Sequence, residues 1–327
     1  MNLLKRNCTL IGASSQIGQE KDGVEAAPQW LRYNKVFDHL NTEFKSVLDR
    51  GDFAPEEIMH LLQTEEELHI LSHYSQNLAQ KITNELKEDN FVLTIGGDHS
   101  IAVGTLGGTH NFDEDVKLIW VDAHADINTF KTSPTGNTHG MPLAWHMHLM
   151  SEENQKPFPW IKKFKKENLV YLGLRDIDPG EQAYLNNLGI KYYTADDVGI
   201  IGIENVLKEI DDYFKPNPGK NVHISFDVDG IDPHFFPATG TPVSGGLSLD
   251  DGKKIINHFC VNYKLLALDL VEINPALGDA GDIQMTLNST RELIGSLSEK
   301  SNIINDKNID KIIDKNTDLE VDSSTLN

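Results

Sequence analysis

The stretch VKLIWVDAHADIN, residues 116–128, decides the fold class, because an apolar run ends in it directly on a cluster of polar side chains. The run lasts from Val116 to Val121, and Asp122, His124 and Asp126 follow it. Short runs with polar flanks are typical of strands that are buried on both faces of a parallel sheet. Comparable runs occur at Phe91 to Ile95, Leu169 to Gly173, Val222 to Phe226 and Leu265 to Val271.

Stretches between these runs show the periodicity of helices. The clearest begins at Thr64 and has Glu67 three residues later, as in a capping box. Its apolar stripe consists of Leu68, Leu71, Leu78, Ile82 and Leu86. Strands that alternate with helices predict a single-domain α/β fold with three layers, α/β/α, around a mostly parallel sheet.

We expect one domain over residues 1–295, because no internal repeat and no linker rich in Pro or Gly precedes that point. Residues 296–327 form a polar tail, which from Lys300 on is rich in Asn, Asp and Lys and lacks aromatic residues. Such a composition buries too little apolar surface to fold alone, so we expect the tail to be disordered or bound to a partner.

Composition excludes several classes of protein. The chain has 50 acidic and 29 basic residues, a formal net charge of −21, so its surface would repel nucleic-acid phosphates but not a small cation. Its two cysteines, Cys8 and Cys260, are too far apart for a disulfide framework or a thiolate zinc site. No apolar run approaches the roughly 18 residues of a membrane span, and the start lacks a secretory signal, so we expect a cytoplasmic location.

Four polar clusters follow directly on predicted strands: GGDHS, DAHAD, DVDG and EINP. Ligands of an open α/β sheet bind at the carboxyl ends of its strands, so we expect the clusters to converge on one site. Residues two apart in an extended chain point to the same side, which aligns the side chains within D-x-H-x-D and within D-x-D. The candidate metal ligands are His99, Asp122, His124, Asp126, Asp227 and Asp229.

Carboxylates packed together repel one another unless a cation lies among them. The four aspartates and two neutral histidines carry a charge of −4, which two divalent cations would neutralise. None of these clusters contains a Lys or Arg that could do so instead. Oxygen and imidazole ligands without thiolate favour an octahedral first-row ion, Mn²⁺ first, with Co²⁺, Fe²⁺ or Ni²⁺ as alternatives. DVDG or GGDH alone is more often a solvated loop or a helix cap, but the joint occurrence of these motifs at strand ends favours a metal site.

Two metals a few ångströms apart can share one hydroxide, which is a nucleophile near neutral pH. A phosphate ester fits poorly as the substrate, because the surroundings are acidic and no P-loop motif occurs. A cation fits better, since Glu272 of VEINP can accept hydrogen bonds from a planar guanidinium group.

At this point the chain resembles the ureohydrolases, binuclear manganese enzymes that hydrolyse guanidino groups to urea. The resemblance rests on GGDHS, DAHADIN, SFDVDGIDP and VEINP and extends from the first strand to about residue 290. Three further segments, DINTF, TGNTHG and GLRDIDPGE, are similar to arginases rather than agmatinases. The resemblance implies hydrolysis of L-arginine to L-ornithine and urea by a metal-bridging hydroxide, two Mn²⁺ per subunit, a place in arginine metabolism such as the urea cycle, and a homo-oligomer, either trimer or hexamer.

The resemblance also implies a role for each site residue. One manganese would be held by His99, Asp122, Asp126 and Asp227, and the other by Asp122, His124, Asp227 and Asp229. The substrate-binding residues would be Asn128, Thr135 and Asn137 at the α-carboxylate, Asp178 at the α-amino group with Glu181 in the same segment, and Glu272 at the guanidinium with Thr241 nearby. His139 would shuttle protons, a task that suits a side chain titrating near neutral pH, because the leaving amine must be protonated.

Some segments depart from the family, and alternatives stay open. Thr135 stands where arginases usually have Ser, and both the opening segment SSQIGQEKDG and the tail are less similar. The chain could instead hydrolyse agmatine or another guanidino compound, or be a metal-binding scaffold without activity. LIGASSQIGQ also resembles the glycine-rich turn of short-chain dehydrogenases, but Gln16 replaces a glycine there and no Tyr is followed four residues later by Lys.

Overall fold

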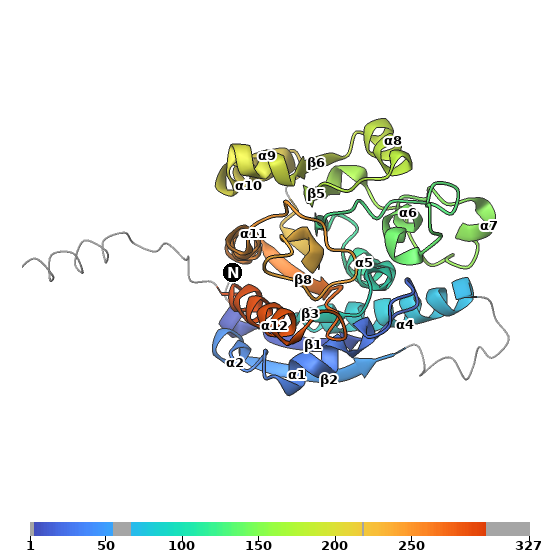
Figure 1. Cartoon of the computed structure of the whole chain (residues 1–327). Coiled ribbons are helices and arrows are strands. Elements are labelled where there is room, and N and C mark those ends of the chain that lie inside the picture. Colours follow the sequence, from blue (N-terminus) through green and yellow to red (C-terminus); the bar gives the residue numbers. More distant parts are fainter. Residues whose placement is uncertain (1–2, 55–66, 218, 299–327) are drawn as a thin grey trace, which may run out of the picture.

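The structure is a computed structural model that describes residues 3–54, 67–217 and 219–298 (Figure 1). In these ranges, eight parallel strands form one sheet in the order β2-β1-β3-β8-β7-β4-β5-β6. The strands are β1 (Asn7–Ala13), β2 (Ser46–Phe53), β3 (Phe91–Gly96), β4 (Lys117–Val121), β5 (Leu169–Leu174), β6 (Lys191–Thr194), β7 (Asn221–Asp227) and β8 (Lys264–Val271). Helices cover both faces of this sheet, which confirms the predicted α/β/α architecture.

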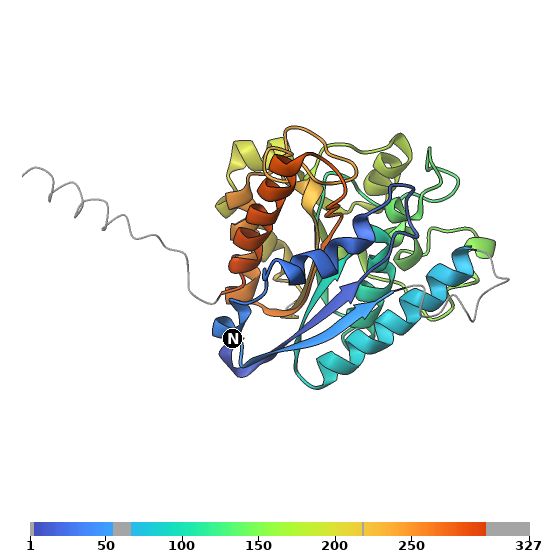
Figure 2. The ribbon, with the colours of Figure 1, turned by 60° about the horizontal axis from the view of Figure 1, so that its bottom comes forward.

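The two helical layers are seen on opposite sides of the sheet in Figures 1 and 2. One layer contains α4 (Glu67–Lys87), α5 (Ala102–Phe112), α6 (Pro142–His146), α7 (Glu152–Gln155) and α8 (Pro179–Leu188). The other contains α1 (Ala27–Tyr33), α2 (Leu40–Glu43), α9 (Ala195–Ile201), α10 (Ile203–Phe214), α11 (Leu249–Asn262) and α12 (Ala280–Gly295).

The core lies on both faces of the central strands. In β3, Phe91 and Leu93 pack in the cluster that contains the α11 and α12 side chains, whereas Val92 packs with α4 and α5. Because successive residues of a strand point to opposite faces, a strand buried on both sides must be apolar almost throughout. The five predicted runs all correspond to strands of this kind, β3, β4, β5, β7 and β8.

Two strands at the edges of the sheet had no such signal. β2 pairs only with β1, and the stretch Asp49–Asp52 within it is largely exposed, so its sequence has no continuous apolar run. β6 is four residues long and forms the opposite edge. An edge strand needs an apolar side chain only where it faces the core, so apolar continuity does not reveal it.

The predicted helix is present as α4, whose Leu71, Leu78 and Ile82 are buried. Its predicted start at Thr64 lies outside the described residues. At the other end of the chain, Leu297 is fully buried directly after α12, while the predicted tail beyond residue 298 lies outside the described part. Within the described ranges, no helix has the length and apolar character to cross a membrane.

Candidate metal centre and substrate pocket

The candidate metal ligands follow the carboxyl ends of three strands that lie close together in the sheet, β3, β7 and β4. Val121 of β4 pairs with Phe226 of β7, so Asp122 and Asp227 are the next residues on two adjacent strands. His99 follows β3, and β8 lies between β3 and β7. Parallel pairing therefore brings together residues that are more than a hundred positions apart in the sequence.

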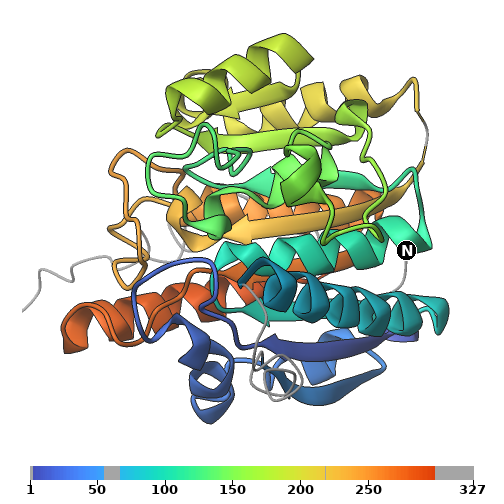
Figure 3. The ribbon, with the colours of Figure 1, turned by 90° about the vertical axis from the view of Figure 1, so that its right-hand side faces the viewer.

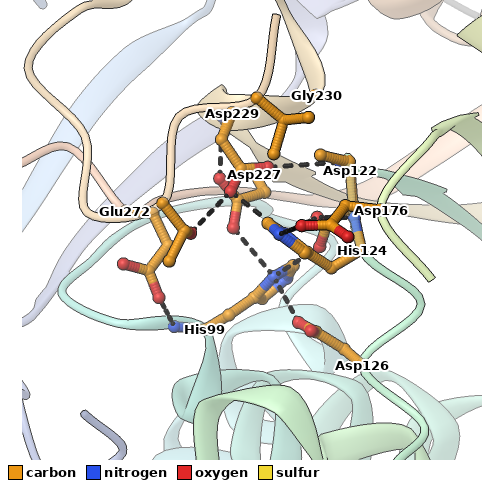
Figure 4. A network of polar contacts seen from close by, with 12 residues as sticks. His99, Asp122, His124, Asp126, Asp176, Asp227, Asp229, Gly230 and Glu272 are labelled. Atoms are coloured by element: carbon orange, nitrogen blue, oxygen red, sulfur yellow. Dashed lines mark hydrogen bonds and ion pairs between the residues drawn. The ribbon is translucent and has the colours of Figure 1, made fainter. Parts of the chain in front are cut away.

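His99 lies among three carboxylates (Figure 4). Its Nδ1 atom is 3.1 Å from Asp122 Oδ2, 3.0 Å from Asp126 Oδ2 and 3.3 Å from Asp227 Oδ2. Within the described part of the chain, this buried nitrogen nevertheless makes no hydrogen bond of acceptable geometry. One imidazole nitrogen and several carboxylate oxygens directed at a common point are what a metal ion requires of its ligands.

A second group adjoins the first. His124 Nδ1 lies 3.3 Å from Asp122 Oδ1 and 3.2 Å from Asp229 Oδ2. Asp122 thus presents one carboxylate oxygen to each histidine, which is the position of a bridging ligand. Asp227 contacts both groups: its Oδ2 lies near His99 Nδ1, and its Oδ1 accepts a hydrogen bond of 2.8 Å from the Asp229 backbone N–H. All six predicted ligands therefore lie in one cluster.

Burial makes this cluster costly without a cation. Burial and the neighbouring Asp122 carboxylate raise the pKa of Asp126 to about 6. Burial and neighbouring carboxylates also raise the pKa values of Asp227 and Asp229. Burial alone would lower the pKa of His99, but the surrounding carboxylates raise it well above its ordinary value. Without a cation, protons bound to these side chains must balance the negative charge of the cluster. The donor atoms, carboxylate oxygens and imidazole nitrogens, fit first-row divalent cations.

A pocket opens above the cluster and is lined by polar side chains of two kinds. Neutral ones are Asn128, Ser133, Thr135 and Asn137, and acidic ones are Asp176, Asp178 and Glu181. His124, Asp126, Asp227, His139 and Thr241 also line it. A zwitterionic amino acid needs donors for its carboxylate and acceptors for its ammonium group, and this lining offers both.

The neutral side is a short loop that holds its own shape. Ser133 Oγ accepts a hydrogen bond of 2.9 Å from the Gly136 N–H, and Thr135 Oγ1 accepts one of 3.2 Å from the Asn137 N–H. Asn128 Nδ2 donates to Asp178 Oδ2 at 2.8 Å, which links the neutral side to the acidic side. The side-chain oxygen of Asn128, Oδ1, is buried and has no hydrogen-bond partner among the residues that the structure describes.

The Glu181 carboxylate joins two segments of the pocket wall through the backbone. It accepts hydrogen bonds of 3.1 Å from the N–H groups of Ile127 and Asp178, the latter as part of the capping box of α8. Burial and the charge of Asp126 raise its pKa to about 8. Glu181 thus fixes the positions of the segments before Asn128 and at Asp178.

His139 and Glu272 form a pair at the wall of the pocket. His139 Nδ1 lies 3.0 Å from Glu272 Oε1, which also accepts a hydrogen bond of 2.9 Å from the His99 N–H. Burial opposes the charge of His139, but the Glu272 carboxylate raises the pKa of His139 to about 9. Thr241 Oγ1 donates to Asp229 Oδ2 at 3.0 Å, so Thr241 contacts one of the candidate metal ligands directly.

Comparison with known proteins identifies this combination of sheet and site. A model of the arginase family matches residues 6–298. The chain belongs to the arginase family. It is 38% identical to Arginase-1 of Homo sapiens over 283 residues, 85% of this chain and 88% of that protein.

Solved structures agree with the match in sequence. The crystal structure of arginase from Bacillus subtilis is similar to this chain with a TM-score of 0.81 and 34% identity, covering 91% of this chain and 100% of that one. The arginase of Entamoeba histolytica in complex with L-ornithine gives a TM-score of 0.79 and 31% identity, covering 91% of this chain and 99% of that one.

Two residues that contact the candidate metal ligands of this arginase-family chain were not singled out from the sequence. Trp120 stacks on His99 with ring centroids 4.1 Å apart, and its Nε1 donates to Asp122 Oδ2 at 2.9 Å. Ser225 Oγ lies 2.9 Å from His99 Nε2. Both lie two positions before a ligand in a strand, so the alternation that aligned the ligands also places them on the ligand face.

Asp176 and Arg175 were also missed, although both belong to the GLRDIDPGE segment. Asp176 lines the pocket, with Oδ2 at 3.7 Å from His124 Nε2. The guanidinium of Arg175 donates to the backbone carbonyls of Asp229 at 2.5 Å and Val243 at 2.6 Å. Arg175 thus binds the backbone behind the cluster, and no ion pair joins it to a carboxylate within the described ranges.

Proposed function

We propose that this chain is an arginase that hydrolyses L-arginine to L-ornithine and urea. The observation that carries the proposal is the combination of a cluster of two histidines and four aspartates with a pocket that has neutral donors on one side and carboxylates on the other. Relatives named arginase, at 36–38% identity over most of the chain, support it. Agmatine lacks the α-carboxylate and would have no use for the neutral donors.

We further propose two Mn²⁺ ions per subunit, with Co²⁺, Fe²⁺ or Ni²⁺ as substitutes. His99, Asp122, Asp126 and Asp227 would hold one ion, and Asp122, His124, Asp227 and Asp229 the other. Bound there, the pair would supply Lewis acidity and a water-derived nucleophile near neutral pH.

The remaining side chains would bind the substrate and move a proton. Glu272 orients the guanidinium, with Thr241 beside it. Asn128, Thr135 and Asn137 bind the α-carboxylate, while Asp178, held in place with Glu181, binds the α-amino group. His139, whose pKa is raised to about 9 by Glu272, is protonated at neutral pH and can donate a proton to the leaving amine.

The oligomeric state and the pathway follow from the family resemblance, and the cellular location from the composition of the sequence. A homo-oligomer, trimer or hexamer, a cytoplasmic location and a role in arginine metabolism such as the urea cycle remain predictions. Size-exclusion chromatography with light scattering would test the first of these.

The decisive experiment measures urea release from L-arginine and from agmatine after loading the protein with Mn²⁺. We expect a higher kcat/KM for L-arginine, and a preference for agmatine would overturn the proposal. Asn128→Ala provides a matched test of the pocket. Loss of a hydrogen bond to a charged group should lower kcat/KM for arginine roughly 10- to 100-fold and leave the value for agmatine unchanged.

A further inference from the structure

The loop between β1 and α1 crosses the site edge of the sheet, where Figure 3 shows it, in dark blue, beside the green and orange loops of the pocket. Ser15 O accepts a hydrogen bond of 3.0 Å from the Asp98 N–H, and Gly18 O accepts one of 3.1 Å from the His139 N–H. Lys21 Nζ donates to Gly240 O. The loop thus contacts three of the segments that carry proposed site residues, although its sequence is only loosely similar to the family.

Gly18 lies at the centre of these contacts. Its N–H donates to Asp98 Oδ2 at 2.9 Å, while its carbonyl accepts from His139. Asp98 is fully buried, and its other oxygen accepts a hydrogen bond of 2.8 Å from the Ser100 N–H. One buried carboxylate therefore fixes the backbone of Gly18, and Gly18 in turn fixes the backbone of His139.

The contacts close into a ring through the side chain of His139. That imidazole binds Glu272, and Glu272 accepts a hydrogen bond from the N–H of His99, the residue after Asp98. Both ends of His139, its backbone and its imidazole, are consequently tied to the segment that begins at Asp98. A ring of this kind leaves the imidazole little freedom to rotate away from Glu272.

We propose that Gly18 and Asp98 are positioning residues for His139, the proton shuttle of the proposed function on which this inference rests. They touch neither substrate nor metal. They hold the backbone of His139 at the distance from which its imidazole reaches both Glu272 and the pocket.

Glycine is required at position 18 for reasons of space. A Cβ atom there would lie 2.5 Å from Asp98 Oδ1 and 2.8 Å from His139 N, closer than carbon atoms approach these groups. With alanine, either Asp98 or the backbone of His139 must move. A displacement of about 1 Å at a catalytic group costs up to roughly 100-fold in rate.

The test compares Gly18→Ala with Gly199→Ala, an exposed glycine whose added Cβ would meet nothing within 4 Å. We expect Gly18→Ala to lower kcat for arginine roughly 10- to 100-fold, with unchanged metal content, and Gly199→Ala to match the wild type. An unchanged kcat in Gly18→Ala overturns the inference. Inactivity of the wild-type protein toward arginine would instead overturn the proposed function.

A double-mutant cycle with His139→Asn separates positioning from general damage. If Gly18 acts through His139, Gly18→Ala should change kcat less than roughly 2-fold in the His139→Asn background. An equal loss in both backgrounds would overturn the inference. If Gly18→Ala fails to fold, Asp98→Asn replaces it in the same double-mutant cycle, and its kcat and metal content are measured. This substitution keeps the size of the side chain but removes one hydrogen-bond acceptor.

Discussion

Removing the metal ions should reverse the pH dependence of stability. The chelated protein is expected to become more stable as the pH falls from about 8 to about 5.5, whereas the metal-loaded protein should lose stability over the same range. The expectation follows from the crowding of buried carboxylates around His99, which either metal ions or protons must neutralise.

The magnitude can be worked out for Asp126. In the metal-free fold, burial and Asp122 raise its pKa from 3.8 to about 6. An acid whose pKa is raised by folding destabilises the fold above that pKa, and the penalty disappears as the pH falls through about 6 toward 3.8. Since each pKa unit corresponds to about 1.4 kcal/mol, Asp126 alone contributes a penalty of about 3 kcal/mol at pH 8.

His139 acts in the same direction. Its pKa is raised from 6.5 to about 9 by Glu272, against the effect of burial. Its stabilisation is therefore fully present below pH 6.5 and is lost as the pH rises through about 9. In the loaded protein, by contrast, acid protonates the ligands and weakens metal binding, so the stability that bound metal supplies declines.

Thermal unfolding of the loaded and chelated proteins at both pH values measures the effect, with Asp126→Asn as the control. The penalty of Asp126 is only partly relieved at pH 5.5, because most of it disappears between that pH and 3.8. The variant carries no charge to bury, so between pH 8 and pH 5.5 its chelated form should lack about 1 kcal/mol of the pH dependence, roughly 2 °C in Tm. The fall in net charge as the pH approaches the pI changes the stability of the wild type and of Asp126→Asn equally. The reasoning is refuted if the chelated variant follows the wild-type pH trend, or if loaded and chelated wild type respond to pH alike.

Three further substitutions test individual residues. Asp229→Ala should lose metal and activity together, because a bridged metal pair tolerates poorly the loss of an anionic ligand. If metal analysis and urea release show that the variant keeps both, Asp229 is not a metal ligand. His139→Asn should lower kcat roughly 10²- to 10⁴-fold at unchanged metal content, and an unaltered rate would exclude the shuttle. Trp120→Phe removes a hydrogen bond to Asp122 and should weaken metal affinity roughly 10- to 100-fold in a metal titration, an effect absent if the indole only fills space.

The central strands and the metal cluster could be predicted because their signals are local. β4 is apolar from Leu118 to Val121, and the alternation of candidate ligands that starts at Asp122 directly follows it. The parallel pairing of β4 with β7 then brings the ligands together: because Val121 pairs with Phe226, Asp122 lies beside Asp227. The edge strand β2 was not predicted, because half of its residues are exposed to solvent and its sequence therefore contains no continuous apolar run.

Contacts over long sequence distances could not be predicted in this way. Gly18 and Asp98 are 80 residues apart, and nothing in SSQIGQEKDG indicates that its backbone would bind a buried carboxylate. The same segment resembled a dinucleotide-binding turn, because a glycine needed for close approach looks alike whether its neighbour is a phosphate or a protein side chain. The role of Arg175 could not be predicted either, because its partners are backbone carbonyls, which every residue type has.

Backbone conformation adds a cost that residue types also conceal. Asp126 and Glu272 have φ angles of 48° and 64°, in the left-handed region that non-glycine residues seldom occupy. Each such residue costs about 1 to 3 kcal/mol and persists only where its surroundings hold it in that conformation. Here they do: the Asp126 carbonyl accepts a hydrogen bond of 3.1 Å from Leu143 N–H, and Glu272 N–H donates to Gly97 O at 2.9 Å. The fold thus bears this cost at two carboxylates that it also buries, which supports the proposal that they bind cations, a metal ion at Asp126 and the guanidinium at Glu272.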